Sequence, residues 1–384
     1  MIFHKQKKGQ VESQFNWIFV LVAGGVILLF FSMFIFRYKS VNDQKLQIKF
    51  YQDLDLQLSL SEVSTTTLNN ISNVPNKNLK FSCKGLGTIG FNKKIVFAPS
   101  TIKATKLGIY TYSFLAPFKV NNFVYVLSPN TKYVFITDRS DETYLDILTT
   151  LGVARESMSR QSFATYSLSN GNSPGNLNAI ANEEKKEKLS EYQSIRFVFI
   201  NQNPSMDLIN DDMDEYYKNS FVSVLHIDSA NQNNPQKLTF YDYDEKFDKM
   251  GSVGQSSYYF DQASLLGAVI VDNKNMYDCM VANAFNRLYY VADTHIQRID
   301  KLSENNNLRP ECKDFYVEPN GLKSGMTSLK EEIAGPLKDI NEFKSIDSPS
   351  ASVDYVKKFN EYVELINTKN DLIRYQIGDC PVIY

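Results

Sequence analysis

Asp138, Ser140 and Glu142 bring three oxygen-bearing side chains to alternate positions after a predicted strand, Tyr133–Thr137. Hard cations such as Mg²⁺ and Ca²⁺ take oxygen ligands, including carboxylates, so this loop is a candidate metal site. Asp and Ser are also favoured helix-capping residues, and a helix is predicted directly after the loop. We favour capping as the interpretation and keep the metal site as the alternative.

The four cysteines are the next groups that could carry chemistry: Cys83, Cys279, Cys312 and Cys380. None forms a C-x-x-C pair, so the usual signature of a zinc site or a thioredoxin-like redox centre is missing. An even count in a translocated domain permits two disulfides, with three possible connectivities. We favour Cys279–Cys312 together with Cys83–Cys380. Four buried thiols are the alternative, because free cysteine is among the most buried residue types.

Two glycine-containing motifs match known functional patterns only in their spacing. Gly85–Gly90 reads G-x-G-x-x-G, but a strand is predicted at Phe91–Ala98, where a dinucleotide site needs a helix. Gly171–Gly175 reads G-x-S-x-G, but Pro174 follows the serine and has no N–H to offer to an oxyanion. The first motif is therefore predicted to be a hairpin, and the second is rejected as a nucleophile elbow.

Histidines and acidic runs offer little further chemistry. His226 lies in a predicted strand and His295 on a predicted long helix, and the sequence has neither an H-E-x-x-H nor a Walker A motif. The acidic runs Asp207–Glu215 and Asp242–Asp248 lack EF-hand spacing and are predicted to be solvated. We therefore predict no catalytic residue and no cofactor, while carboxylate or Ser/Lys chemistry stays open.

The overall composition limits the class of partner. The net charge is −2, which provides no basic field, so binding to nucleic acid is not expected. The chain holds 26 Phe and 23 Tyr, and aromatic residues at this level suit strands and argue against bulk disorder. The composition therefore favours a folded domain with its own core.

An uncharged apolar segment extends from Trp17 to Phe36, and the hydroxyl of Ser32 is its only polar group away from Trp17. About twenty helical residues rise roughly 30 Å, which is the thickness of the hydrocarbon core of a bilayer. The run is longer than the apolar core of a signal peptide, and no A-x-A-like cleavage site follows it. We predict an uncleaved signal anchor that contacts the lipid bilayer through residues 17–36.

Basic residues flank the apolar segment on both sides, so the charge bias does not decide its orientation. They are Lys5, Lys7 and Lys8 before the segment and Arg37, Lys39, Lys45 and Lys49 after it. A short basic tail is easily retained, and long domains are translocated largely regardless of charge. We therefore expect the N-terminus inside and the soluble domain outside the cell membrane.

The stretch KKGQVESQFNWIFVLVAGGVILLFF resembles the N-terminus of uncharacterised single-pass membrane proteins from small-genome archaea of the DPANN group. The ending Cys380–Tyr384 is similar too, and the likeness implies anchoring without implying an activity. A weaker resemblance is to archaeal type IV pilin leaders, with Lys7–Gly9 and Gln10 as the processing site. The sequence departs from that pattern because the mostly polar stretch Gln10–Gln14 separates the site from the apolar run.

The loop Asp138–Glu142 is also similar to the metal-binding D-x-S-x-S loop of von Willebrand A-type domains. It departs from that pattern in its last position, which is Glu142. The likeness implies a cation bound by Asp138, Ser140 and Glu142 in the alternative interpretation of this loop.

The hydrophobic periodicity predicts an α/β, or mixed α+β, fold with a transmembrane helix, a β-rich subdomain, α/β layers and a long helical C-terminal part. The predicted strands are Leu79–Cys83, Lys94–Ala98, Leu107–Phe114, Phe118–Leu127, Tyr133–Thr137, Ile195–Ile200, Phe221–Ile227 and Leu238–Tyr243. The predicted helices cover 41–62, 142–151, 206–218, 276–302, 326–346 and 352–375. Alternating leucines at 54–60 keep a strand open there.

The domain boundaries follow from these elements and from shifts in composition. They are a basic tail at 1–16, the transmembrane helix at 17–36, a stalk and linker at 37–77, a β-rich subdomain at 78–165, a polar linker at 166–193 and an α/β subdomain at 194–384. Within the first linker, residues 63–77 are predicted to be a polar loop.

Three functions are compatible with these residues. The favoured one is a non-enzymatic, membrane-anchored binding or structural protein with an unknown protein partner. The second is a membrane-tethered α/β enzyme or nucleotide-binding protein, whose site would lie at strand ends marked by Asp138, Asn201, Asp228 or Asp272. It predicts a pocket that joins at least two of those loops. The third is a minor pilin-like subunit, cleaved after Gly9.

Overall fold

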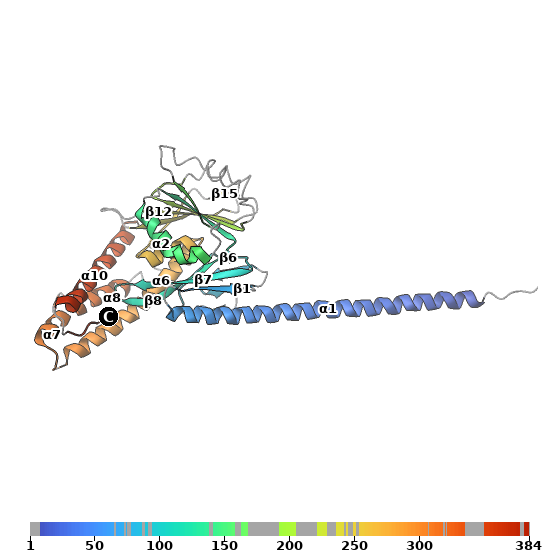
Figure 1. The fold of residues 1–384 in the computed structure, drawn as a ribbon, viewed down its shortest axis with the longest axis horizontal. Helices are drawn as coiled ribbons and strands as arrows, with labels where there is room; N and C mark the ends of the chain where they lie inside the picture. The colour runs from blue at the N-terminus through green and yellow to red at the C-terminus, as the bar shows by residue number, and fades with distance from the viewer. Residues whose placement is uncertain are drawn as a thin grey trace, which may run out of the picture. The chain divides into compact units, whose positions relative to one another are not determined.

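The computed structural model divides the chain into two compact units, Met1–Asp53 and Leu54–Tyr384. It describes residues 8–64, 67–72, 74, 78–86, 89–90, 94–137, 141–157, 163–167, 192–204, 221–228, 236–241, 243–244, 249–250, 253–305, 307–317, 319, 321–334, 349–376 and 380–383. The fold is mixed α+β, as predicted, with an apolar N-terminal helix, sheets in the middle of the chain and helices at its C-terminal end (Figure 1).

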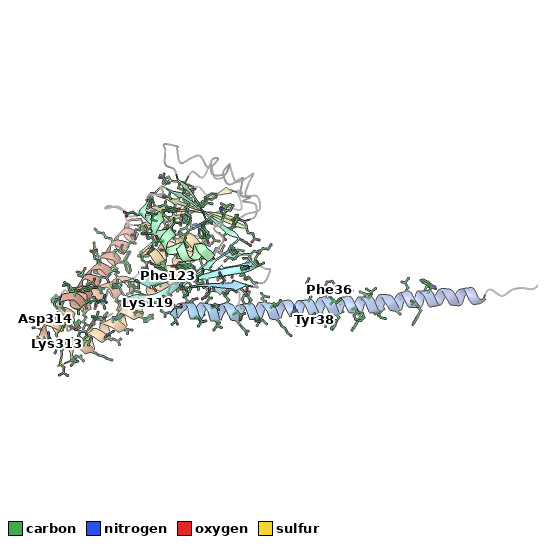
Figure 2. All side chains as sticks on the ribbon, in the orientation of Figure 1. Phe36, Tyr38, Lys119, Phe123, Lys313 and Asp314 are labelled. Carbon is green, nitrogen blue, oxygen red and sulfur yellow. A yellow bond between two sulfur atoms is a disulfide. The ribbon has the colours of Figure 1, made fainter. Side chains whose placement is uncertain are left out.

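Helix α1 (Lys8–Val63) contains the apolar segment, which lies in the first unit. Within the 23 residues Trp17–Lys39, the most apolar stretch of 18 residues has a mean hydropathy of 2.8, and none of that stretch is buried. Figure 2 shows Phe36 and Tyr38 standing out from the helix, and these side chains are 73% and 69% exposed. The segment is therefore long and apolar enough to cross a membrane.

The last turns of α1 belong to the second unit. Leu54 and Leu58 are fully buried there, at the i, i+4 spacing that predicted a helix. The buried ammonium of Lys94 donates to Asp55 Oδ1 at 2.7 Å on the same turn of the helix. The helix predicted at 41–62 is confirmed, and the alternative strand is wrong, because Leu56, which lies between the two buried leucines, is exposed.

The largest sheet has six strands in the order β10-β9-β11-β12-β13-β16. These strands are β9 (Thr131–Thr137), β10 (Phe163–Ser167), β11 (Ser194–Ile200), β12 (Phe221–Asp228), β13 (Lys237–Tyr241) and β16 (Gln255–Tyr258). The first four strands in the spatial order are parallel, whereas β13 and β16 are antiparallel to their neighbours. Strand β9 is buried along its whole length, as expected for an apolar strand covered on both faces.

Strand β9 lies between β10 and β11, so later parts of the chain add strands on both of its sides. Helix α2 (Glu142–Ser157) connects β9 to β10 on one side, and β11 then pairs with the opposite side of β9. The order of the parallel strands therefore reverses between β9 and β11, which makes their carboxyl ends a topological switch point. The same sheet includes strands on both sides of the linker predicted at 166–193, since β9 precedes it and β11 follows it.

Smaller sheets are formed mostly by residues that precede β9. The sheet β1-β7-β8-β5 contains β1 (Leu68–Ser72), β5 (Val96–Phe97), β7 (Lys106–Leu115) and β8 (Lys119–Leu127). The sheet β4-β3-β2-β6 contains β2 (Leu79–Ser82), β3 (Gly85–Leu86), β4 (Ile89–Gly90) and β6 (Thr101–Ile102). A separate two-stranded ribbon pairs β14 (Tyr243–Asp244) with β15 (Lys249–Met250). The polar loop predicted at 63–77 is wrong at β1, because Ile71 is buried there and the strand pairs with β7.

Helix α5 (Gln262–Ile270) lies between the large sheet and the sheet that contains β7 and β8 (Figure 1). On one side, the buried guanidinium of Arg196 in β11 donates to the backbone oxygen of Ala268 at 3.1 Å. On the other side, the hydroxyl of Tyr125 in β8 donates to the backbone oxygen of Ala263 at 2.7 Å. Both sheets therefore hold α5, and with it one wall of the site described below.

The C-terminal helices are α6 (Lys274–Ser303), α7 (Pro310–Val317), α8 (Leu322–Glu332) and α10 (Pro349–Gln376). Two disulfides fasten this part of the chain: Cys83–Cys279 joins the turn after β2 to α6, and Cys312–Cys380 joins α7 to the C-terminal segment. The favoured pairing of Cys279 with Cys312 and of Cys83 with Cys380 is therefore wrong. The fold brings α6 to the turn after β2, and sequence order contains no signal for that contact.

Several sequence predictions concern residues outside the described part of the chain. They are the helix at 206–218, the end of the helix at 326–346 from residue 335 onward, the motif Gly171–Gly175, most of the linker at 166–193 and the first seven residues of the basic tail. The long helix predicted at 276–302 is confirmed within α6, and the helix predicted at 352–375 is confirmed within α10.

Candidate functional site

A pocket of about 410 Å³ opens at the carboxyl ends of β9 and β11, which is the switch point of the large sheet. Asp141 lies in the loop after β9, Asn201 directly follows β11, and Gln236 directly precedes β13. Asp261 and Gln262 at the start of α5 form the facing wall. In open α/β sheets, the crevice at such a point is the usual place of a ligand site.

One wall of the pocket is set by a contact between the two loops. Asn201 adopts a left-handed backbone conformation with φ of 55°, which asparagine tolerates better than most residues. Its Nδ2 donates to Asp141 Oδ2 at 2.5 Å, and Asp141 Oδ1 accepts the backbone N–H of Tyr144 at 3.2 Å. Asp141 thus caps α2 and holds Asn201 at the pocket, in agreement with the predicted capping role of this loop.

The facing wall is set by the N-terminus of α5. Asp261 Oδ1 accepts the backbone N–H of Ser264 at 2.8 Å, and the two residues form a capping box. Gln262 Nε2 donates to the backbone oxygen of Asp146 at 2.9 Å, and its Oε1 accepts the hydroxyl of Tyr112 at 3.1 Å. Gln262 therefore connects α5 to both α2 and β7 beside the pocket, and these two hydrogen bonds fix the position of this wall.

The charge of the pocket is strongly negative. Its described lining includes four carboxylates, Asp141, Glu142, Asp146 and Asp261, and neither Lys nor Arg. Helices α2 and α5 both begin here, and each helix N-terminus contributes roughly half a positive charge. With all four carboxyls ionised the local charge is therefore roughly −3. The carboxylates outweigh the helix dipoles.

Burial changes the titration of two lining groups. Desolvation raises the pKa of Asp261 from 3.8 to about 6, although hydrogen bonds from Ser264 and Ala263 oppose the change. Desolvation also raises the pKa of Tyr259 to about 12, so its phenol stays neutral and can donate a hydrogen bond. The amide oxygen Oε1 of Gln236 is buried and has no hydrogen-bond partner within the described part of the chain.

The metal prediction is only partly covered by the structure. Asp138 and Ser140 lie outside the described residues, and Glu142 is the first residue of α2, at the pocket. Among the residues that are described, no group of three or more His, Cys, Asp or Glu side chains is placed to hold a metal ion. The metal role of Asp138, Ser140 and Glu142 therefore stays a prediction.

Most other candidates lie away from the pocket. Asp228 at the end of β12 is 3.3 Å from Nε2 of the buried His226, and Asp272 accepts the backbone N–H of Ser100 at 2.8 Å. The ring of His295 packs against Phe118. Of the four strand ends predicted to form a site, the pocket contains Asn201, together with Asp141 and Glu142, which are the nearest described residues after Asp138.

The glycine motif is a hairpin, as predicted. Strand β3 pairs antiparallel with β4, and Gly85 has a φ of 154°, in the positive region that favours glycine. The pocket residues Asp146, Tyr259, Asp261 and Gln262 were missed by the sequence predictions. A usable signal existed for one of them, because Asp261 stands three residues before Ser264 and an apolar run follows.

Comparison with known proteins finds no matching family model, no matching curated protein and no matching solved structure. The chemistry of the pocket is therefore inferred from its own residues. Those residues provide more hydrogen-bond acceptors than donors. They lie at the carboxyl ends of parallel strands, where such sheets usually bind small molecules.

Proposed function

We propose that this protein is a membrane-anchored binding protein whose soluble domain lies outside the membrane and binds a small polar ligand that carries positive charge. The observation that carries the proposal is the carboxylate-lined pocket at the switch point between β9 and β11. The segment Trp17–Lys39 would hold the domain at the membrane surface. The chemical class of the ligand is an amine or a guanidinium compound.

The balance of charges supports a cationic ligand over a phosphorylated one. Phosphate sites use free backbone N–H groups at helix N-termini together with Lys or Arg. Here Asp141 and Asp261 already accept N–H groups of the first turns of α2 and α5. A cation would instead meet the carboxylates and the ring of Tyr259, and a ligand N–H could satisfy the buried Oε1 of Gln236.

The disulfides support a location outside the cytoplasm. All four cysteines are paired, as Cys83–Cys279 and Cys312–Cys380. Disulfides form and persist in oxidising compartments and are rare in the cytosol. An N-terminus inside and a domain outside would agree with this pairing and with the short basic tail before the apolar segment.

The binding test uses the full-length chain in lipid nanodiscs and isothermal titration with four probes. Agmatine and spermidine carry positive charge, whereas inorganic phosphate and ATP are anionic. We expect binding of at least one cationic probe and none of the anions. Binding of ATP or phosphate in preference to both amines would contradict the proposal and favour the nucleotide-binding alternative, and binding of no probe would also count against it.

Matched variants place the binding at the pocket. Glu142→Gln and Asp146→Asn each remove one negative charge while keeping the side-chain shape, and each is expected to weaken cation binding about tenfold, which corresponds to about 1.4 kcal/mol. Asp371→Asn removes an exposed carboxylate of α10 and is expected to leave binding unchanged. Equal effects of all three variants would show that only the net charge of the chain matters.

A further inference from the structure

Strand β1 contains an acceptor motif for N-linked glycan. Asn70-Ile71-Ser72 is the only N-x-S/T triplet of the sequence in which the middle residue is not proline. The one other triplet of this kind begins at Asn203 and has Pro204 in the middle, which excludes it as an acceptor. Such a motif is modified only in proteins that are exposed outside the cytoplasm.

Strand β1 presents the side chains of Asn70 and Ser72, the two residues that define the acceptor motif, on one side. Asn70 and Ser72 are exposed, whereas Ile71 between them is buried. Successive side chains of a strand point to opposite faces, so the amide of Asn70 and the hydroxyl of Ser72 share the exposed face. The buried Ile71 anchors the strand without covering either group.

The position of β1 in its sheet leaves the acceptor accessible. Among the described strands, β1 pairs only with β7, and it is the edge strand of the sheet β1-β7-β8-β5. Gly108 is the residue opposite Asn70 in this pair, and it has no side chain that could cover the amide. The acceptor therefore lies on an exposed edge strand, where a bulky group can be attached without displacing the core.

We propose that Asn70 is an N-glycosylation site. The inference rests on the proposed location of the domain outside the membrane. The donor would be an oligosaccharide linked to a lipid phosphate. Asn70 Nδ2 forms a bond to the anomeric carbon of the first sugar, and the bond from that carbon to the phosphate oxygen breaks. The amide loses one proton and the lipid phosphate leaves with the bonding electrons, so no oxidant or reductant is needed.

A glycan at Asn70 has a second consequence, because it covers the edge of β1. An unpaired edge offers backbone N–H and C=O groups to other chains, and proteins cover or charge such edges to prevent association. The glycan therefore keeps β1 from pairing with a second copy of the chain held in the same membrane.

The test uses the full-length chain synthesised in the presence of microsomes, with a glycosidase-sensitive mass shift as the readout. Asn70→Gln and Ser72→Ala destroy the motif and are expected to abolish the shift. Ser72→Thr keeps the motif, and Asn69→Gln changes the neighbouring amide while leaving the motif intact, so both are expected to retain the shift. Loss of the shift in the two control variants as well would overturn the assignment.

Protection of the domain from added protease reports its location independently of the glycan. A protected but unmodified wild-type chain would overturn the Asn70 assignment and leave the proposed location intact. A chain that is digested outside the microsomes would overturn both, because the domain would then face the cytosol. Mass spectrometry of the protein from its native membranes is expected to find glycan on the Asn70 peptide, and an unmodified peptide there would refute the proposal.

Discussion

Replacing Asp261 by asparagine tests how strongly this half-buried carboxylate of the pocket opposes folding. Asn is as good an N-cap residue as Asp, so Asp261→Asn keeps the hydrogen bond that caps α5 and removes only the charge. Burial raises the pKa of Asp261 from 3.8 to about 6. Each pKa unit corresponds to about 1.4 kcal/mol, so ionised Asp261 lowers the free energy of unfolding by roughly 3 kcal/mol.

The sign of the pH dependence follows from the direction of this pKa change. The native state holds the proton more tightly than the unfolded state, so the contribution of neutral Asp261 is fully present below pH 3.8. It is lost as the pH rises through about 6. The variant has no such loss. We expect similar stabilities near pH 4 and a variant that is more stable than the wild type by up to roughly 3 kcal/mol near pH 8.

The assay is thermal or denaturant unfolding of the full-length chain in micelles at pH 4, 6 and 8, followed by circular dichroism. The quantity of interest is the variant-minus-wild-type difference, because other titrating groups cancel in it. Asp261→Ala is a useful comparison, since it also loses the cap and should be less stable than Asp261→Asn by about 1 kcal/mol. A difference that is the same at all three pH values would refute the burial explanation.

The remaining predictions concern the core and the disulfides. Gly267→Ala should destabilise the fold by about 1–3 kcal/mol, because the added Cβ would lie 2.6 Å from the ring of Phe97. This cost is expected to exceed the gain that alanine normally brings to a helix. Gly108→Ala is the matched control, since its nearest contact would be an ordinary 3.6 Å, and it should cost little; equal unfolding midpoints for the two variants would contradict the packing argument. Replacing Cys312 and Cys380 together by serine opens a loop of 68 residues and should lower the free energy of unfolding by about 4 kcal/mol. Denaturation with and without reductant checks this value, and a wild type insensitive to reductant would count against it.

Elements with a strong local pattern were predictable from the sequence. The apolar run Trp17–Phe36 determines a helix long enough for a membrane, because its length and lack of charge need no tertiary partner. The i, i+3/i+4 spacing of apolar residues determined α6, and aromatic and β-branched runs determined β7, β8, β9 and β11. Short elements such as β1 and β16 were missed, because a few mixed residues form a strand only when a neighbouring strand supplies hydrogen bonds.

The pocket between β9 and β11 depends on contacts that no local pattern encodes. Asp141 and Asn201 are 60 residues apart in the chain and meet because β9 and β11 are parallel neighbours whose carboxyl ends lie at one edge. Asp261 joins them because two sheets hold α5 in place, and Cys83 meets Cys279 because the fold brings the turn after β2 to α6. The sequence alone determined which residues are apolar, charged or able to cap a helix. Only the tertiary structure decided which of them are neighbours, since strand order and disulfide pairing are properties of the whole packed chain.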